Sequence, residues 1–443
     1  MHTQITADSL MNRERTSGLQ LLTLFFCFLV VAADGFDVAS VGYVAPLLKK
    51  AWSLTPGQLG PIFGAGLLGL TMGSFLFGPL ADRIGRKRVI VISLILFGAG
   101  SLACSFAATP HWLVALRLLT GIGLGGAMPT AITLSSEFSS QRKRAWQVTL
   151  MFCGFTLGLA FGGAVAAALI PSFGWQGVFV FGGIVPLCLA PMIWRWIPES
   201  LRFMAGKPRF NSEALSVMQR LVGKHTPIPD ITVEQSAPDN ATTNRIITTL
   251  FDNYYRRGTL LLWLTFFCTL WVYYQISSWL PIIFTEAGIS VTEAATIGAM
   301  MPVGGTIGAL INGKLMDKYN PFIVLSFSYL VAAISIGCIG LAITDAHLIY
   351  VVVFCTGLGL SGAQTGANVL VSGFYTTRAR ATGVSWALAI GRIGSIVGSM
   401  TGGIILAHMA SVQTAFIAFA FPTVIAGLAM LVIGSIYQNH SVK

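Results

Sequence analysis

The chain has 443 residues, of which 54% are hydrophobic and only 10% are charged. An average soluble protein carries about 25% charged residues, so a water-soluble globule of this composition would lack a polar coat. The same composition excludes disordered, collagen-like and disulfide-scaffold chains. A protein that crosses the membrane many times remains. Twelve crossings of about 20 apolar residues each would use roughly 240 residues, which the chain can supply.

Apolar stretches long enough to span a bilayer recur along the whole chain. The first follows a polar segment and has full length, so we expect an uncleaved first helix rather than a signal peptide. We predict twelve membrane-spanning helices, near residues 19–45, 58–80, 88–107, 111–136, 145–169, 176–197, 259–284, 293–313, 321–343, 347–373, 380–407 and 412–437.

The basic residues are distributed by side of the membrane. A net charge of +11 would suggest nucleic acid in a soluble protein, but all except four of the 27 Lys and Arg fall in alternate polar segments. The exceptions are Arg117 and Arg392 inside apolar spans and Lys49 and Lys50 beside one short loop. This positive-inside pattern predicts a multi-pass membrane protein with both termini cytoplasmic. It gives no basic face for nucleic acid.

The two ends of the chain are related by an internal repeat. Residues 120–124 (TGIGL) recur as residues 356–360 (TGLGL), an offset of 236, and the loop 78–83 recurs as 313–318 at an offset of 235. Six helices separate the copies, so both copies run in the same direction. Parallel repeats of this kind build the major facilitator fold, in which substrate binds near the membrane midplane.

The repeat divides the chain into two six-helix halves and a linker. We predict an N-terminal half at 1–197, a cytoplasmic linker loop at 198–258 and a C-terminal half at 259–443. The linker is the one long polar stretch and is broken by several prolines. The expected fold is an all-α polytopic membrane protein with twelve transmembrane helices in two parallel-repeat bundles.

Three motifs resemble the major facilitator superfamily. They are residues 78–88 (GPLADRIGRKR), residues 117–123 (RLLTGIG) and residues 198–200 (PES). Many branches of the superfamily share them, sugar porters included. A narrower resemblance is to the aromatic acid:proton symporters, in particular the 4-hydroxybenzoate/protocatechuate permease type. It is carried by residues 34–37 (DGFD), 151–155 (MFCGF) and 380–392 (RATGVSWALAIGR).

The resemblance implies a proton-coupled importer of a small aromatic carboxylate that works by alternating access. Hydroxybenzoates, protocatechuate, benzoate, phenylpropionate and vanillate are substrates of that family, and the motifs do not separate them. Import of a ring-opened dicarboxylate such as cis,cis-muconate is the first alternative. Another carrier of the superfamily, for sugars or drugs, and a membrane sensor that transports nothing are further alternatives.

Two acidic residues lie in the first predicted span. Asp34 and Asp37 are three residues apart, so they share one face of a helix. Burial and mutual repulsion both favour a protonated carboxyl, as a proton carrier requires. We predict that the pair couples protons to transport, and either member could carry the proton. Alternatively, one of them caps a break at Gly35 or pairs with an arginine.

Two arginines lie inside apolar spans and have no charged counterpart in the repeat. Arg117 aligns with Val353, and Arg392 aligns with Thr156. A guanidinium binds a carboxylate with two parallel hydrogen bonds. We predict Arg392 as the carboxylate anchor. Arg117 is a second substrate ligand, or it pairs with one of the helix aspartates and couples the proton to conformation. For both arginines the alternative is a static salt bridge between helices.

The family resemblance assigns a cytoplasmic gate to the loop motif. It implies that Asp82 meets the positive end of another helix and that Arg86 meets an acid at the base of the fourth helix, where Glu137 stands. Asp317 is the copy of Asp82 in a degenerate second motif. Alternatively, this loop is a solvated basic segment that only sets topology.

Polar and aromatic side chains near mid-span are candidates for the substrate cavity. Aromatic rings would stack on an aromatic acid, and amides would read its ring hydroxyls. The candidates are Tyr273 and Gln275 in the seventh span, Gln364 and Asn368 in the tenth and Trp386 in the eleventh. A membrane-interface or lipid-facing position is the alternative for each.

The sequence gives no sign of an enzyme. The six histidines are scattered at loops and helix ends, and no Gly-Lys-Ser/Thr phosphate loop occurs. The seven cysteines lie in apolar runs without metal-binding spacing. We therefore expect no catalytic residue, metal or cofactor. The expected partners are an organic acid, protons and the lipid bilayer, and we expect a monomer to function.

Overall fold

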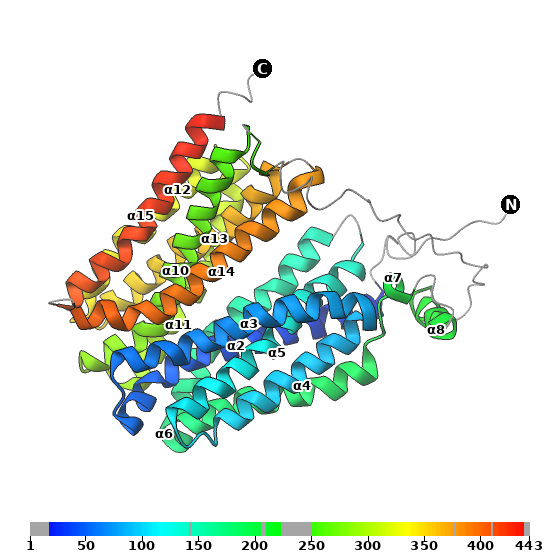
Figure 1. The fold of residues 1–443 in the computed structure, drawn as a ribbon, viewed down its shortest axis with the longest axis horizontal. Coiled ribbons are helices and arrows are strands. Elements are labelled where there is room, and N and C mark those ends of the chain that lie inside the picture. Colours follow the sequence, from blue (N-terminus) through cyan, green and yellow to red (C-terminus); the bar gives the residue numbers. More distant parts are fainter. Residues whose placement is uncertain are drawn as a thin grey trace. The chain divides into compact units, whose positions relative to one another are not determined.

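The computed structural model describes residues 17–140, 144–204, 210–222, 250–252, 254–375, 377–408 and 411–437, and within these ranges every long element is a helix (Figure 1). The two chain ends and most of the predicted linker lie outside the described residues. The helices are α2 (Gly18–Trp52), α3 (Pro56–Ile84), α4 (Arg86–Cys104), α5 (Pro110–Glu137), α6 (Arg144–Trp196), α7 (Leu201–Met204), α8 (Asn211–Val222), α10 (Arg256–Glu286), α11 (Val291–Met316), α12 (Pro321–Ala342), α13 (Leu348–Phe374), α14 (Thr377–His408) and α15 (Val412–Tyr437).

Eleven of the described helices are long and apolar enough to cross a membrane. One of them, α6, is two helices joined at Gly174, whose backbone (φ 62°, ψ −163°) is not helical. Glycine tolerates this conformation because it has no Cβ. The predicted spans 145–169 and 176–197 lie on either side of this residue, so the described helices account for all twelve predicted spans. The all-α membrane fold is therefore confirmed.

The contacts divide the chain into two compact units. The first comprises Met1–Val38, Leu68–Gly158 and Phe179–Asp239, and the second comprises Ala39–Leu67, Leu159–Val178 and Asn240–Lys443. Three helices, α2, α3 and α6, contribute segments to both. The division into two halves joined by a linker stays a prediction.

The first unit has an apolar core around α4 and α5, which lie side by side (Figure 1). Phe97 of α4 and Leu134 of α5 are buried there, together with Phe26 of α2. The short helix α8 packs on the same core through Met218 and Leu221. Together with Val217 they form the buried apolar face of an amphipathic helix, which holds this part of the linker against the core.

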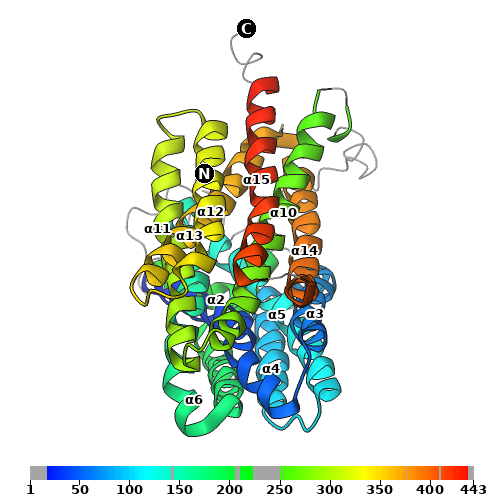
Figure 2. The ribbon, with the colours of Figure 1, turned by 90° about the vertical axis from the view of Figure 1, so that its left-hand side faces the viewer.

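The second unit is built from helix pairs among α10–α15. Helix α11 packs on α13, α10 packs on α14, and α12 packs on α15. Figure 2 shows α12 and α15 side by side. Tyr329 of α12 is fully buried and shares a hydrogen bond with Thr269 of α10, with the two oxygens 2.9 Å apart. Such hydrogen bonds between helices satisfy polar groups that lipid cannot.

Glycines at equivalent repeat positions allow close helix contacts in both units. A Cβ at Gly158 of α6 would collide with the carbonyl oxygen of Ala32 in α2, and a Cβ at Gly394 of α14 would collide with that of Phe267 in α10. Small residues let backbones approach each other in membrane helices. The glycines at these two repeat positions therefore have the same structural role, which is to allow close contact between two helices.

We expect that replacing Gly394 by valine will lower stability by about 1–3 kcal/mol, the usual cost of overpacking. The obstacle is a backbone carbonyl, which cannot rotate away as a side chain can. The measurement is the melting temperature of purified protein in detergent. Gly337→Val in α12 is the matched control, because no heavy atom lies within 4 Å of its Cβ position. Equal melting temperatures for the two variants would contradict the interpretation.

Candidate functional site

The aspartate and arginine predicted in helices α2 and α5 form a buried ion pair in the first unit. Nη2 of Arg117 lies 2.8 Å from Oδ2 of Asp37, and its Nη1 donates to Oδ1 at 3.4 Å. Asp37 is fully buried and Arg117 is 2% exposed. The guanidinium also lies over the ring of Phe179. The two contacts, one short and one long, partly offset the desolvation of the pair, while Nε of Arg117 has no hydrogen-bond partner among the described residues.

Asp34 lies one helical turn before Asp37 and is also fully buried. Helix α2 continues without interruption past Gly35, because Gly18–Trp52 is one helix. The alternative that one aspartate caps a break at Gly35 is therefore wrong. Of the two predicted partners, the structure assigns Asp37 to Arg117.

Arg392 is in a different electrostatic situation from Arg117. It lies within α14 in the second unit and is partly buried. No carboxylate of the described residues forms an ion pair with its guanidinium. Charged groups inside a membrane span are normally paired. An arginine that has no acid of the protein beside it can bind the carboxylate of a ligand.

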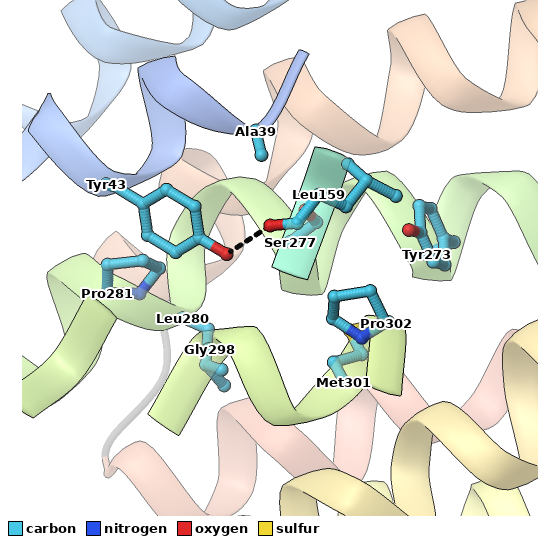
Figure 3. A pocket seen from close by; sticks show the side chains of 10 residues that line it. All are labelled: Ala39, Tyr43, Leu159, Tyr273, Ser277, Leu280, Pro281, Gly298, Met301 and Pro302. Atoms are coloured by element: carbon cyan, nitrogen blue, oxygen red, sulfur yellow. Dashed lines mark hydrogen bonds between the residues drawn. The ribbon is translucent and has the colours of Figure 1, made fainter. Parts of the chain in front are cut away.

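Tyr273 lines a small enclosed cavity in the second unit, together with Tyr43 and Ser277 (Figure 3). The Tyr43 hydroxyl donates to the carbonyl oxygen of Leu159 at 3.3 Å. About 10 Å³ of this cavity is free, which suits one water molecule or one hydroxyl group. In the described state it is therefore too small for an aromatic acid.

Gln275 lies two residues further along α10. It is 1% exposed, and its Nε2 has no hydrogen-bond partner among the residues that the structure describes. A buried amide donor without a partner costs about 1–3 kcal/mol. Such a donor is available to a polar group of a ligand.

The other cavity candidates lie on α13 and α14. Gln364 donates from its Nε2 to Oδ1 of Asn368 at 3.3 Å, one turn along α13. The ring of Trp386 stacks on that of Trp263 in α10, with centroids 5.6 Å apart and planes inclined by 22°. Sequence reasoning missed Trp263 because its partner is distant in the chain. Among the described residues, no ring contact joins Trp386 to Tyr273 and no hydrogen bond joins it to Gln275.

The predicted gate residues of the first unit lie together. Arg86 forms ion pairs with Asp82 at 2.9 Å and with Glu137 at 3.4 Å. It also donates from Nη1 to the carbonyl oxygen of Ala81 at 3.2 Å. Asp317 is exposed at the end of α11. The role of these residues as a gate stays a prediction.

Comparison with known proteins decides the family. A model of the Major Facilitator Superfamily matches residues 27–355 and 262–441. The chain belongs to this superfamily. It is 41% identical over 415 residues to a gallate transporter of Pseudomonas putida, covering 94% of this chain and 92% of the relative. It is 38% identical over 437 residues to the 4-hydroxybenzoate transporter PcaK of Pseudomonas aeruginosa, covering 97% and 96%.

Among solved structures, the inward open conformation of the xylose transporter XylE from E. coli is similar in fold. Its TM-score is 0.73 at 15% identity, covering 93% of this chain and 95% of that chain. The recognition of a major facilitator protein related to the aromatic acid transporters is thus confirmed. So is the expectation of a multi-pass membrane transporter rather than an enzyme, which follows from the family and its relatives.

The superfamily motif at residues 198–200 has a structural function that sequence reasoning did not assign. Oε1 of Glu199 accepts hydrogen bonds from the backbone N–H groups of Arg86 at 2.9 Å and Lys87 at 3.1 Å. These are the first amides of α4, which have no partner within the helix. Burial raises the pKa of Glu199, while the hydrogen bonds that it accepts oppose this rise.

Gly85 of the loop motif makes room for this carboxylate. Its φ is 110°, which favours glycine, and a Cβ there would collide with the Glu199 carboxylate. The signal available in sequence was the joint presence of the two motifs. Their contact across 113 residues could not be read from spacing.

Proposed function

We propose that this chain imports a small aromatic carboxylate together with protons, by alternating access, across the bacterial inner membrane. The observation that carries the proposal is Arg392, an arginine inside a membrane span that has no acidic partner among the described residues. A substrate carboxylate would supply the missing counterion. The names of the relatives support an aromatic acid, since they transport gallate and 4-hydroxybenzoate.

The pairing of Arg117 favours a monocarboxylate over a ring-opened dicarboxylate. A second carboxylate of a substrate such as cis,cis-muconate would need a second cation in the membrane. Arg117 already forms an ion pair with Asp37. In the proposed mechanism Arg392 holds the carboxylate, while Tyr273, Gln275, Gln364, Asn368 and Trp386 line the ring site.

Protons enter the proposed mechanism through α2. Asp34 and Asp37 are both fully buried, so an added proton removes a charge that is costly in the membrane. A proton on Asp37 would weaken its ion pair with Arg117 and so change the contact between α2 and α5. One proton with one monovalent anion moves no net charge and responds only to the pH gradient. A second proton would add about 2.3 kcal/mol per 100 mV of membrane potential.

The proposed topology has both termini in the cytoplasm and the gate residues on the cytoplasmic side. Asp82, Arg86, Glu137 and Asp317 would close that side, with the chain acting as a monomer in the bilayer. The predicted halves at 1–197 and 259–443 would be the moving bodies, joined by the linker 198–258.

The direct test is uptake of radiolabelled 4-hydroxybenzoate by cells that express the chain. We expect accumulation that a protonophore abolishes and that gallate, protocatechuate and benzoate inhibit, with no inhibition by a hexose. Strongest inhibition by cis,cis-muconate would assign a ring-opened acid instead. Cells that take up none of these acids, with the protein present in their membranes, would overturn the proposed function.

Replacing Asp34 by asparagine is expected to abolish accumulation against a gradient and to leave exchange of internal for external substrate. An asparagine has the shape of a protonated aspartate but can neither bind nor release a proton. The measurement compares protonophore-sensitive uptake with exchange in proteoliposomes that have equal pH on both sides. Loss of both activities to the same extent would show that Asp34 does not act in proton coupling.

A further inference from the structure

A charged hollow lies at the C-terminal ends of α2 and α10, within the second unit. It has a volume of about 530 Å³ and is open to solvent. Its lining includes Lys49, Lys50 and Ser53 from the end of α2 and Thr285 and Glu286 from the end of α10. The volume is large enough for a small aromatic acid, but the hollow is open, so a bound acid would keep much of its surface in solvent.

The charges of the hollow are unequal. Nζ of Lys49 forms an ion pair with Oε1 of Glu286, with the side chains 29% and 50% exposed. Lys50 is exposed, and no acid among the described residues pairs with it. Two lysines and one glutamate leave a net charge of +1 at the mouth of the hollow. An anion is therefore attracted, and Lys50 is available to bind it.

The position of these lysines is unusual for a membrane protein. On the proposed external side, the loop after α2 is followed by five further short loops, and none of these five contains Lys or Arg. They lie near residues 105–111, 170–176, 285–292, 344–347 and 408–412. The positive-inside rule disfavours basic residues in external loops. Topology therefore does not account for Lys49 and Lys50, which lie in the last turn of α2, where the helix dipole favours cations. Glu286 pairs with Lys49, and Lys50 is left for an anion.

We propose that this hollow is an external capture site for organic carboxylates. The substrate occupies it before it reaches the membrane interior. Lys50 binds the carboxylate, and the hydroxyl of Ser53 is a hydrogen-bond donor beside it, whereas the hydroxyl of Thr285 already donates to the carbonyl oxygen of Ile282. The arriving carboxylate also competes with Glu286 for Lys49. The inference rests on the proposed function, because it assumes import of aromatic carboxylates from this side.

The attraction is weak and depends on salt, since Lys50 and Glu286 are exposed and Lys49 is only partly buried. Exposed ion pairs contribute about 0.2–1 kcal/mol, which corresponds to a factor of roughly 1.4 to 5 in affinity. The Debye length falls from about 30 Å at 0.01 M salt to about 8 Å at 0.15 M salt. The site thus raises the local substrate concentration and the rate of encounter.

The first experiment measures uptake kinetics of radiolabelled 4-hydroxybenzoate at low salt. We expect Lys50→Gln to raise KM about 1.4- to fivefold with kcat unchanged, and Glu286→Gln to lower KM. Both effects should shrink at higher salt. Arg220→Gln is the matched control, because it removes one exposed positive charge from α8, on the proposed cytoplasmic side. Unchanged KM in both hollow variants, or an equal change in the control, would overturn the proposal.

A second experiment detects occupancy without transport. Intact cells are treated with a membrane-impermeant amine-acylating reagent, and acylation of Lys50 is measured by mass spectrometry with and without benzoate. We expect benzoate to protect Lys50, and a neutral benzyl alcohol at equal concentration to have no effect. No protection in cells that accumulate 4-hydroxybenzoate would overturn the capture site alone. Absence of uptake would overturn the proposed function, whatever the labelling shows.

Discussion

Uptake of 4-hydroxybenzoate is expected to fall about a hundredfold when Arg392 is replaced by glutamine. Removing one partner of a desolvated charge pair costs about 2–5 kcal/mol, and 1.4 kcal/mol corresponds to a factor of ten. Arg392→Lys keeps the charge but loses the planar fork that binds both carboxylate oxygens. We expect it to fall between the wild type and the glutamine variant. The measurement is kcat/KM for initial uptake, normalised to the amount of protein in the membrane.

A stability measurement separates an anchor from a structural arginine. No described acid depends on Arg392, so Arg392→Gln should leave the melting temperature of the substrate-free protein unchanged or slightly raised. Substrate should raise the melting temperature of the wild type, because ligands that bind only the folded state stabilise it. It should not do so in the variant. Retention of the substrate-induced shift in Arg392→Gln would refute the anchor.

The contrast between the two arginines could be predicted only in part from the sequence. Both stood out because their repeat counterparts, Val353 and Thr156, are uncharged. That comparison detects a charge that the fold does not require, but it does not indicate its partner. Asp34 and Asp37 lie on the same face of α2, and only the register of α2 against α5 decides between them. The pairing of Arg117 with Asp37 therefore needed the structure.

The fold was accessible from the sequence because its determinants are local or periodic. Apolar length predicts membrane spans, and a constant offset of glycine motifs predicts the repeat. Contacts between segments distant in the chain were not accessible. Glu199 binds the first amides of α4, and Glu286 pairs with Lys49. The partner of each acid lies more than a hundred residues away in the chain. Their identities as acids were visible, but no spacing in the sequence pointed to their partners.

The buried pair of Asp37 and Arg117 gives the second large effect. Asp37→Asn leaves a buried guanidinium without its acid, and breaking a buried pair in this way costs about 3–5 kcal/mol. Arg117→Gln should be milder, since an unpaired aspartate can take up a proton whereas arginine cannot lose one. We therefore expect the melting temperature to fall most in Asp37→Asn. Uptake should be lost in both single variants.

The double variant Asp37→Asn/Arg117→Gln separates the two roles that the sequence left open. Removing both charges removes the unpaired ion, so the double variant should recover most of the lost stability. If the pair is a static bridge, uptake should recover together with stability. If the pair couples protons to transport, uptake against a gradient should stay absent in a protein of nearly normal stability. We expect the second outcome, because Asp37 is fully buried inside a membrane span, where an ionisable group is costly and indicates a function in transport. Recovery of protonophore-sensitive accumulation in the double variant would remove Asp37 from the proton pathway and leave that role to Asp34.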